Sequence, residues 1–155
     1  LDDADIDDAV DAAAFGCFAN SGQICMSTER IIVDQKIADE FVKKFAAKAK
    51  NLPLGDPRKS EPVVLGSVIG MSTVEHCNAL IDDARAKGAT IMSLLPAGES
   101  ADPAARRLPP TLIVDARDDM AVMQEEIFGP LLPIETYTTI DEAIARVNAR
   151  PRPLA

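Results

Sequence analysis

The sequence predicts an α/β protein of three layers, in which helices cover both faces of a mainly parallel sheet. Amphipathic helical patterns alternate with short β-branched runs in the order α-β-α-α-β-β-β-α. A strand that is followed at once by a helix is the usual unit of a parallel sheet. The chain has 155 residues, of which 47% are apolar, so it is long enough for one ordinary domain and too short for two.

Three helices and one strand are predicted in the first half of the chain. Residues 5–19 and 37–49 carry apolar side chains at helical spacing, and the β-branched residues 30–34 between them predict a strand. After a Pro- and Gly-rich stretch over 52–71, Ser72-Thr73-Val74-Glu75 reads as a capping box that opens a third helix. Gly88 is expected to close that helix.

Three strands and a last helix are predicted in the second half. Residues 89–95, 111–116 and 131–137 are the strand candidates, and 96–110 reads as an exposed loop. Because a proline cannot donate to a β ladder, Pro133 places the third of these strands at an edge or a bulge. Thr139 to Glu142 then cap a helix whose apolar residues are Ile140, Ala143, Ile144 and Val147.

Charge and composition exclude two classes of partner. The net charge is −9, but six aspartates lie at positions 2, 3, 5, 7, 8 and 11, so the acidity belongs mostly to one helix start. There is no basic stripe, no Trp and one Tyr, which gives a nucleic-acid surface no support. No apolar run approaches the ~20 residues of a membrane span and no signal sequence opens the chain. We therefore expect a soluble, cytoplasmic protein with neither kind of partner.

The three cysteines have to be judged separately. An odd number at irregular spacing makes no disulfide framework, and a single histidine gives no usual zinc site, so no metal is expected. Cys17 and Cys77 lie on apolar helical stripes, where a thiol acts as a small hydrophobe. Cys25 belongs to a polar connection, where reactive groups are often displayed. Spacing alone leaves open whether it is reactive or an ordinary loop cysteine.

Two motifs resemble those of one family. Asn20-Ser21-Gly22-Gln23-Ile24-Cys25 resembles the N-x-G-Q-x-C motif of the aldehyde dehydrogenase superfamily, and Glu125-Glu126-Ile127-Phe128-Gly129-Pro130 resembles its E-E-x-F-G-P motif. The order and separation of the motifs also fit. The similarity extends over almost all of the chain, so the resemblance implies an aldehyde-dehydrogenase-like catalytic domain.

The resemblance implies a role for each motif residue. Cys25 would be the nucleophile that forms a thiohemiacetal and then a thioester, and its backbone N–H would be half of an oxyanion hole. Asn20 is expected only to shape the turn. Glu126 would bind the nicotinamide-ribose hydroxyls of NAD or NADP, and Phe128 would lie beside the nicotinamide ring. Gly129-Pro130 would turn the chain.

The resemblance also indicates a substrate class. On the family pattern Ile24 and Met26 help to line an apolar substrate pocket, and Ala19 stands where many relatives have an aromatic residue. Residues 25–30 are similar to salicylaldehyde and vanillin dehydrogenases, and the part from residue 110 onward, including 150–155, is similar to coniferyl aldehyde dehydrogenases. An aromatic aldehyde is therefore the expected substrate.

Several parts of that family are not found in this sequence. The family's catalytic glutamate and its dinucleotide-binding domain are expected before Leu1, and no G-x-G-x-x-G motif occurs. Residues 1–155 are thus expected to be a truncated catalytic (thiol) domain without the NAD-binding domain, inactive alone and part of a homo-oligomer when full length. Two alternatives remain: a non-catalytic fragment with a structural or subunit-association role, and a cofactor-independent thioesterase. His76 is too far from Cys25 in sequence to favour the latter.

Overall fold

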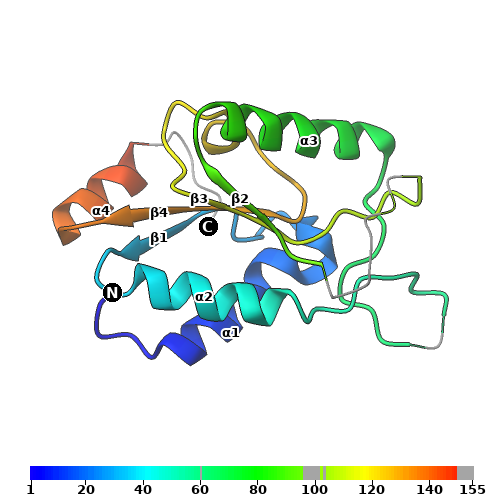
Figure 1. The fold of residues 1–155 in the computed structure, drawn as a ribbon, viewed down its shortest axis with the longest axis horizontal. Coiled ribbons are helices and arrows are strands. Elements are labelled where there is room, and N and C mark those ends of the chain that lie inside the picture. The colour runs from blue at the N-terminus through cyan, green and yellow to red at the C-terminus, as the bar shows by residue number, and fades with distance from the viewer. Residues whose placement is uncertain (60, 96–101, 103, 150–155) are drawn as a thin grey trace.

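A four-stranded mixed sheet forms the centre of the molecule, a computed structural model that describes residues 1–59, 61–95, 102 and 104–149 (Figure 1). The strands are β1 (Ile31–Asp34), β2 (Thr90–Ser93), β3 (Thr111–Val114) and β4 (Leu131–Tyr137), in the order β1-β4-β3-β2. β4 runs parallel to both of its neighbours, and β2 pairs antiparallel with β3. The predicted mainly parallel sheet is confirmed.

Helices cover both faces of this sheet (Figure 1). The helices α1 (Ile6–Phe18) and α2 (Ala38–Ala49) lie on one face, α3 (Met71–Ala86) lies on the other, and α4 (Ile140–Asn148) follows β4. Two short 3₁₀ helices, η1 (Ala19–Gly22) and η2 (Ala121–Met123), complete the elements. The three-layer α/β class and the predicted order of helices and strands are therefore confirmed.

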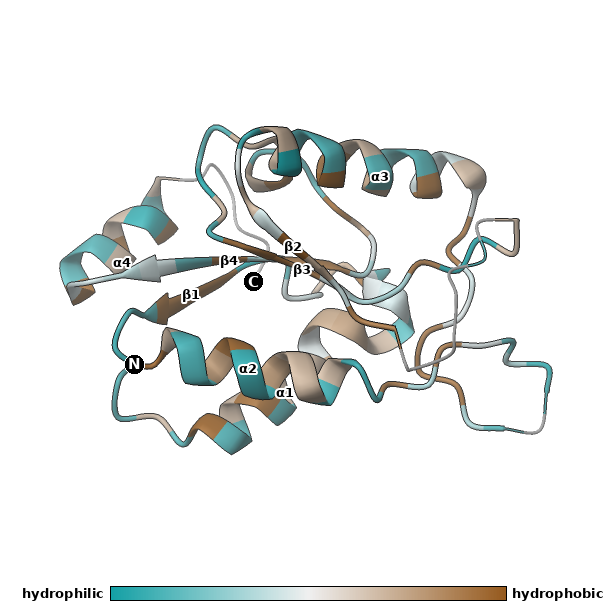
Figure 2. Ribbon diagram, in the orientation of Figure 1, coloured by the Kyte–Doolittle hydropathy of each residue, from teal (hydrophilic) through white to brown (hydrophobic). Residues whose placement is uncertain are grey.

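The core is divided in two by the sheet. Figure 2 shows the largely hydrophobic strands between helices of mixed character. On the α1 and α2 side, the ring centroid of Phe45 lies 5.8 Å from that of Phe18 and 5.6 Å from that of Phe41. A second cluster gathers around α3 and includes Val74, Cys77, Leu80, Ala84 and Ile113. The apolar stripes of the first and third predicted helices are thus buried as expected.

The acidic N-terminal segment pairs with α2. Asp5 caps α1 by accepting from the N–H groups of Asp7 and Asp8. Three ion pairs then join the segment to the region of α2: Asp2–Lys36, Asp7–Lys44 and Asp11–Lys48. Much of the charge that the sequence concentrates here is therefore balanced within the fold.

The start of α3 corrects the predicted capping box. The helix begins at Met71 with Gly70 as its N-cap, and no side chain caps it. Because the backbone of Val74 already donates to the carbonyl of Gly70, Ser72 lies inside the first turn and not at the cap position. The other end agrees with the prediction, since Gly88 adopts φ +91° and donates to Arg85.

Pro133 lies in the central strand, so its predicted place at an edge or a bulge is wrong. It pairs with Ile113 of β3, and alternate residues of a strand direct their backbone groups to opposite neighbours. The carbonyl of Ile134 accepts from Ala116 on the β3 side, so Pro133 faces the β1 side. The β1 ladder begins only at Ile134, opposite Ile31. The missing N–H of Pro133 is therefore needed by neither neighbour.

The last helix is capped as predicted but keeps an apolar face exposed. The Thr139 side chain accepts from the N–H of Glu142, whose carboxylate accepts from Thr138. Ile140, Ile144 and Val147 are about half exposed and, with residues such as Ile32 and Tyr137, line a groove of about 370 Å³.

No helix among the described residues is long and apolar enough to cross a membrane. The predicted loop over 96–110 falls partly, and residues 150–155 wholly, outside the described residues.

Candidate active site

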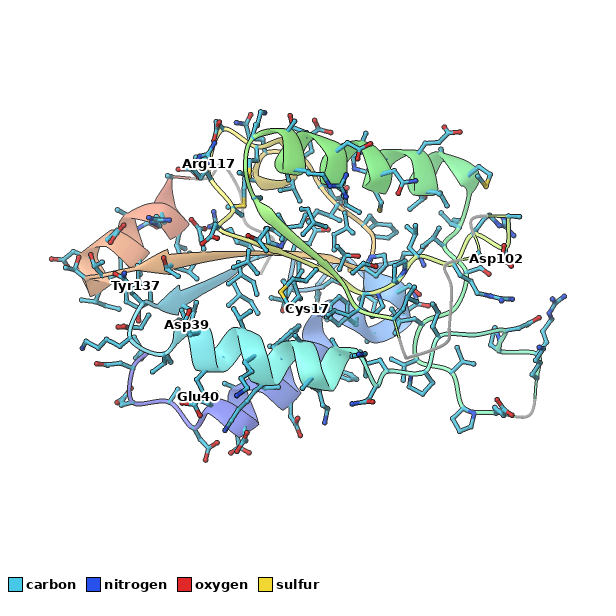
Figure 3. All side chains as sticks on the ribbon, in the orientation of Figure 1. Cys17, Asp39, Glu40, Asp102, Arg117 and Tyr137 are labelled. Atoms are coloured by element: carbon cyan, nitrogen blue, oxygen red, sulfur yellow. The ribbon has the colours of Figure 1, made fainter. Side chains whose placement is uncertain are left out.

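Cys25 is the exposed cysteine of the three. It lies between η1 and β1, in a connection where the N–H of Ser27 donates to the carbonyl of Ile24 and the N–H of Thr28 donates to Gly16. Cys17 is buried, and burial raises the pKa of its thiol to about 12 (Figure 3). Cys77 is also buried; its pKa is raised to about 11 by desolvation and, secondly, by the charge of Glu29. Both are core thiols, as the sequence predicted.

A left-handed turn precedes Cys25. Asn20, Ser21 and Gly22 have φ values of 52°, 59° and 72°. The amide Nδ2 of Asn20 donates to the carbonyl of Gln23 at 3.1 Å, and the backbone N–H of Gln23 donates back to Asn20 at 3.2 Å. Asn20 therefore shapes the turn through its side chain, as expected, since Asn tolerates the left-handed region better than most residues.

Two side chains of the turn connect it to the segment before α3. The buried hydroxyl of Ser21 donates to the carbonyl of Gly66 at 3.2 Å. The amide Oε1 of Gln23 accepts from the backbone N–H of Ile69 at 2.8 Å. The turn is thus held on one side by residues more than forty positions further along the chain.

The two sequence motifs meet through two glycines. A Cβ on Gly22 would overlap the carbonyl group of Gly129, so the backbones touch where neither residue has a side chain. A Cβ on Gly129 would lie 2.5 Å from the Sγ of Cys77. The contact of Gly22 with Gly129 therefore joins the first motif directly to the second.

Glu126 and Phe128 are exposed on a segment whose backbone is bound by residues from other parts of the chain. Glu126 is exposed, whereas Ile127 between them is buried. Phe128 is 36% exposed, and its backbone has φ +46°. A ring N–H of His76, at Nε2, lies 2.9 Å from the carbonyl of Glu126 and donates to it. Cys25 and these two predicted cofactor residues thus belong to adjoining segments.

Glu29 binds the same segment from the side of Cys25. Its carboxylate accepts from the backbone N–H of Phe128 at 2.8 Å and from that of Ile127 at 3.1 and 3.2 Å. The sequence motifs predict no role for Glu29 or His76. The only feature of the nearby sequence that points to Glu29 is its place in the polar connection after Cys25. The backbone groups that Glu29 binds lie almost a hundred residues away, so local patterns could not predict them.

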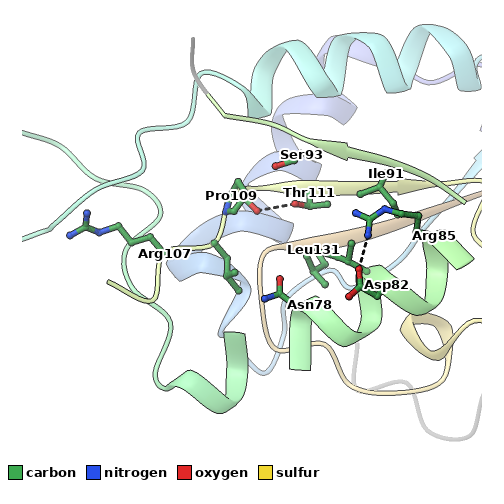
Figure 4. A pocket seen from close by; sticks show the side chains of 11 residues that line it. Asn78, Asp82, Arg85, Ile91, Ser93, Arg107, Pro109, Thr111 and Leu131 are labelled. Atoms are coloured by element: carbon green, nitrogen blue, oxygen red, sulfur yellow. Dashed lines mark hydrogen bonds and ion pairs between the residues drawn. The ribbon is translucent and has the colours of Figure 1, made fainter. Parts of the chain in front are cut away.

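The predicted substrate-pocket residues are at least partly exposed to solvent. Ala19 is half-buried in η1, while the exposed fractions of Ile24 and Met26 are 37% and 69%. A cavity of about 360 Å³ lies elsewhere, between α3 and β2, beside the ion pair of Asp82 and Arg85 (Figure 4). None of the predicted site residues lines that cavity.

Comparisons with known proteins show which family this chain resembles. The model of the aldehyde dehydrogenase family matches residues 1–155. Salicylaldehyde dehydrogenase of Pseudomonas sp. (strain C18) is 47% identical over 148 residues, which are 96% of this chain and 29% of that protein. Vanillin dehydrogenase of Pseudomonas fluorescens is 49% identical over 131 residues, 84% of this chain and 26% of that protein.

A solved structure is similar as well. The crystal structure of a salicylaldehyde dehydrogenase from Pseudomonas putida G7, complexed with salicylaldehyde, superposes with a TM-score of 0.85 at 41% identity. The superposition covers 96% of this chain and 29% of that one. The chain therefore spans less than a third of the length of the relatives that it matches.

Proposed function

Because the chain belongs to the aldehyde dehydrogenase family, we propose that its residues form the thiol-bearing part of an enzyme that oxidises an aldehyde to a carboxylic acid with NAD or NADP. Cys25 is the proposed nucleophile. The observation that carries the proposal is the contact of Gly22 with Gly129, because it joins the exposed thiol's segment to the one that displays Glu126 and Phe128.

The proposed chemistry begins at the sulfur of Cys25. Its thiolate attacks the carbonyl carbon of the aldehyde, a C–S bond forms, and the carbonyl oxygen becomes an oxyanion that the backbone N–H of Cys25 stabilises. Loss of a hydride from that carbon, which bound NAD or NADP would accept, leaves a thioester. Water then adds to the thioester carbonyl, the C–S bond breaks, and the carboxylic acid, a proton and the thiolate are released. Sulfur suits both stages because a thiolate is a strong nucleophile and also a good leaving group.

The residues present fit one part of the cofactor. Bound NAD or NADP would supply the hydride acceptor. Glu126 keeps an exposed carboxylate while its carbonyl is bound by His76, so its side chain can accept from ribose hydroxyls. Phe128, two residues further along the chain, is partly exposed, so its ring would offer a flat surface to a nicotinamide. No G-x-G-x-x-G motif occurs in the sequence, so the pyrophosphate would be bound by other residues of the full-length protein.

An aromatic aldehyde is the proposed substrate. Relatives named for salicylaldehyde and vanillin match 96% and 84% of the chain, and a similar salicylaldehyde dehydrogenase from Pseudomonas putida G7 is solved with salicylaldehyde. The exposed apolar side chains of Ile24 and Met26 flank Cys25 in sequence and are available to contact a ring. Ala19 supplies a small side chain at the end of α1.

Aldehyde oxidation by the full-length protein tests this proposal. Reduced nicotinamide is measured with benzaldehyde-type and short aliphatic aldehydes, for the wild type, Cys25→Ala and the control Cys17→Ala. We expect turnover of the aromatic aldehydes, a loss of at least about 10³-fold in Cys25→Ala and near wild-type rates in the control. Activity that survives Cys25→Ala would remove the nucleophile from its role. Turnover of aliphatic aldehydes alone would refute the substrate class.

The isolated 155-residue chain is a separate case. We propose that it is the catalytic (thiol) domain only and oxidises no aldehyde by itself, because no dinucleotide-binding motif occurs in it. Hydride transfer by the isolated chain, followed as reduced nicotinamide, would contradict this assignment.

A further inference from the structure

The Glu29 carboxylate occupies a small anion site made of backbone. The N–H groups of Ile127 and Phe128 are consecutive donors, and both are directed at the same carboxylate, the shortest distance being 2.8 Å. Phe128 has a left-handed backbone, with φ +46°. Successive N–H groups around a left-handed residue form a concave site for an anion. In this fold the anion is a side chain of the protein itself.

The charge of Glu29 is directed to that site and not to a cation. The neighbouring Arg30 pairs with Glu135 on β4, at 3.4 Å. No ion pair joins Glu29 to any cation of the described part of the chain, and the half-buried carboxylate is bonded only to the two backbone N–H groups. Hydrogen bonds that involve an ionised group are shorter and stronger than neutral ones. Glu29 therefore stabilises a backbone shape that is otherwise unfavourable for phenylalanine.

The position of Glu29 links two functional segments. It follows Cys25 by four residues in the same connection, and that connection is tied to α1 through the N–H of Thr28. Its two donors belong to the segment that displays Glu126 and Phe128. A displacement of either N–H would move one of these side chains relative to the thiol.

We propose that Glu29 is a positioning residue that holds Glu126 and Phe128 in the arrangement that receives the nicotinamide end of the cofactor. This inference rests on the proposed function. Glu29 touches neither substrate nor cofactor; it acts through the backbone of residues 127 and 128. Its loss is expected to weaken nucleotide binding without changing the reactivity of Cys25.

Glu29→Gln in the full-length protein is the test, since glutamine has the same shape but a neutral amide with one acceptor oxygen. Calorimetry measures the Kd for NAD and NADP, and hydrogen exchange measures the amides of Ile127 and Phe128. We expect Kd to rise at least about 10-fold and exchange to quicken at least about 10-fold, as for a lost charge-assisted hydrogen bond. Alkylation of Cys25 by iodoacetamide is expected to stay within about 3-fold of the wild type.

Two further variants complete the test. Glu75→Gln removes an exposed carboxylate of α3 as a matched control and is expected to leave Kd unchanged. Glu29→Asp keeps the charge on a shorter arm and is expected to restore part of the affinity; it carries the test if Glu29→Gln does not fold.

The outcomes separate this inference from the proposed function. An unchanged Kd in Glu29→Gln, whether or not exchange quickens, would overturn the positioning role. A wild-type protein that binds nucleotide but oxidises no aldehyde would overturn the reaction, and the Kd comparison would still decide the role of Glu29. A wild-type protein that binds neither NAD nor NADP would overturn both.

Discussion

Gly22 lies directly against the carbonyl of Gly129, so the turn before Cys25 and the segment of Glu126 and Phe128 meet without an intervening side chain. Gly22 also has φ +72°, a conformation that other residues adopt at a cost. Glycine is therefore required here for two independent reasons, one steric and one conformational.

Gly22→Ala is expected to impair both folding and activity. The left-handed backbone costs about 1–2 kcal/mol, and the overlap with Gly129 adds about 1–3 kcal/mol. Urea unfolding and aldehyde oxidation of the full-length protein measure the effect. Gly66→Ala is the matched control, because its Cβ would only reach ordinary contact with Pro57 at 4.0 Å. Equal losses in both variants would argue against the close approach.

The three cysteines are expected to react in a fixed order. Iodoacetamide at pH 8 should label the exposed Cys25 at least about 100-fold faster than Cys17 or Cys77, because the thiolate is the reactive form and the buried thiols have pKa values of about 12 and 11. Mass spectrometry of digested protein identifies the labelled residue. In denaturant the three rates should converge, and rapid native labelling of Cys17 would disprove its burial.

Acid is expected to loosen α4 through Glu142. Bonds from the Thr138 N–H and then from Arg146 lower the pKa of Glu142 from its usual 4.5 to about 2. A lowered pKa in the folded state stabilises it above pH 4.5, and this contribution is lost as the pH falls from 4.5 towards 2. Hydrogen exchange of residues 138–149 should therefore show that α4 opens more readily at low pH than at neutral pH.

The control for this pH effect is Glu142→Gln. In this variant α4 should open more readily than in the wild type at neutral pH. Its hydrogen-exchange rates, corrected for intrinsic exchange, should change less between pH 6 and pH 3 than those of the wild type. Asp141→Asn, at an exposed neighbouring carboxylate, should behave like the wild type. The same acid response in Glu142→Gln as in the wild type would assign the effect to another group.

Glu135→Gln is expected to destabilise the junction of β1, β4 and α4. Glu135 is 2% exposed and lies 3.4 Å from Arg30 and 2.6 Å from Arg146. Removing its charge takes the ion-pair partner from Arg30 and leaves Arg146 paired with Glu142 alone. Both arginines are partly exposed and can rehydrate, so we expect a loss of about 1–3 kcal/mol. Urea unfolding measures it. Glu40→Gln, which breaks the exposed pair with Lys44, should cost less than about 0.5 kcal/mol.

Local patterns in the sequence were sufficient for the order of the elements. Hydrophobic periodicity over residues 5–19 and β-branching over 30–34 depend on neighbours along the chain, and both predictions are confirmed. The same local reasoning was wrong for Ser72 and Pro133. Whether a Ser is a cap depends on where the preceding backbone turns, and whether a Pro is tolerated depends on which neighbouring strand has already begun.

The sequence by itself determined the three-layer α/β class, the separation of Cys25 from the two core thiols and the two motifs that resemble one family. The tertiary structure alone decided how those motifs meet: through Gly22 and Gly129, with Glu29 bonded to the backbone of residues 127 and 128. These contacts span about a hundred residues. Local propensity carries no information about them, because packing across the sheet and not adjacency in the chain brings their atoms together.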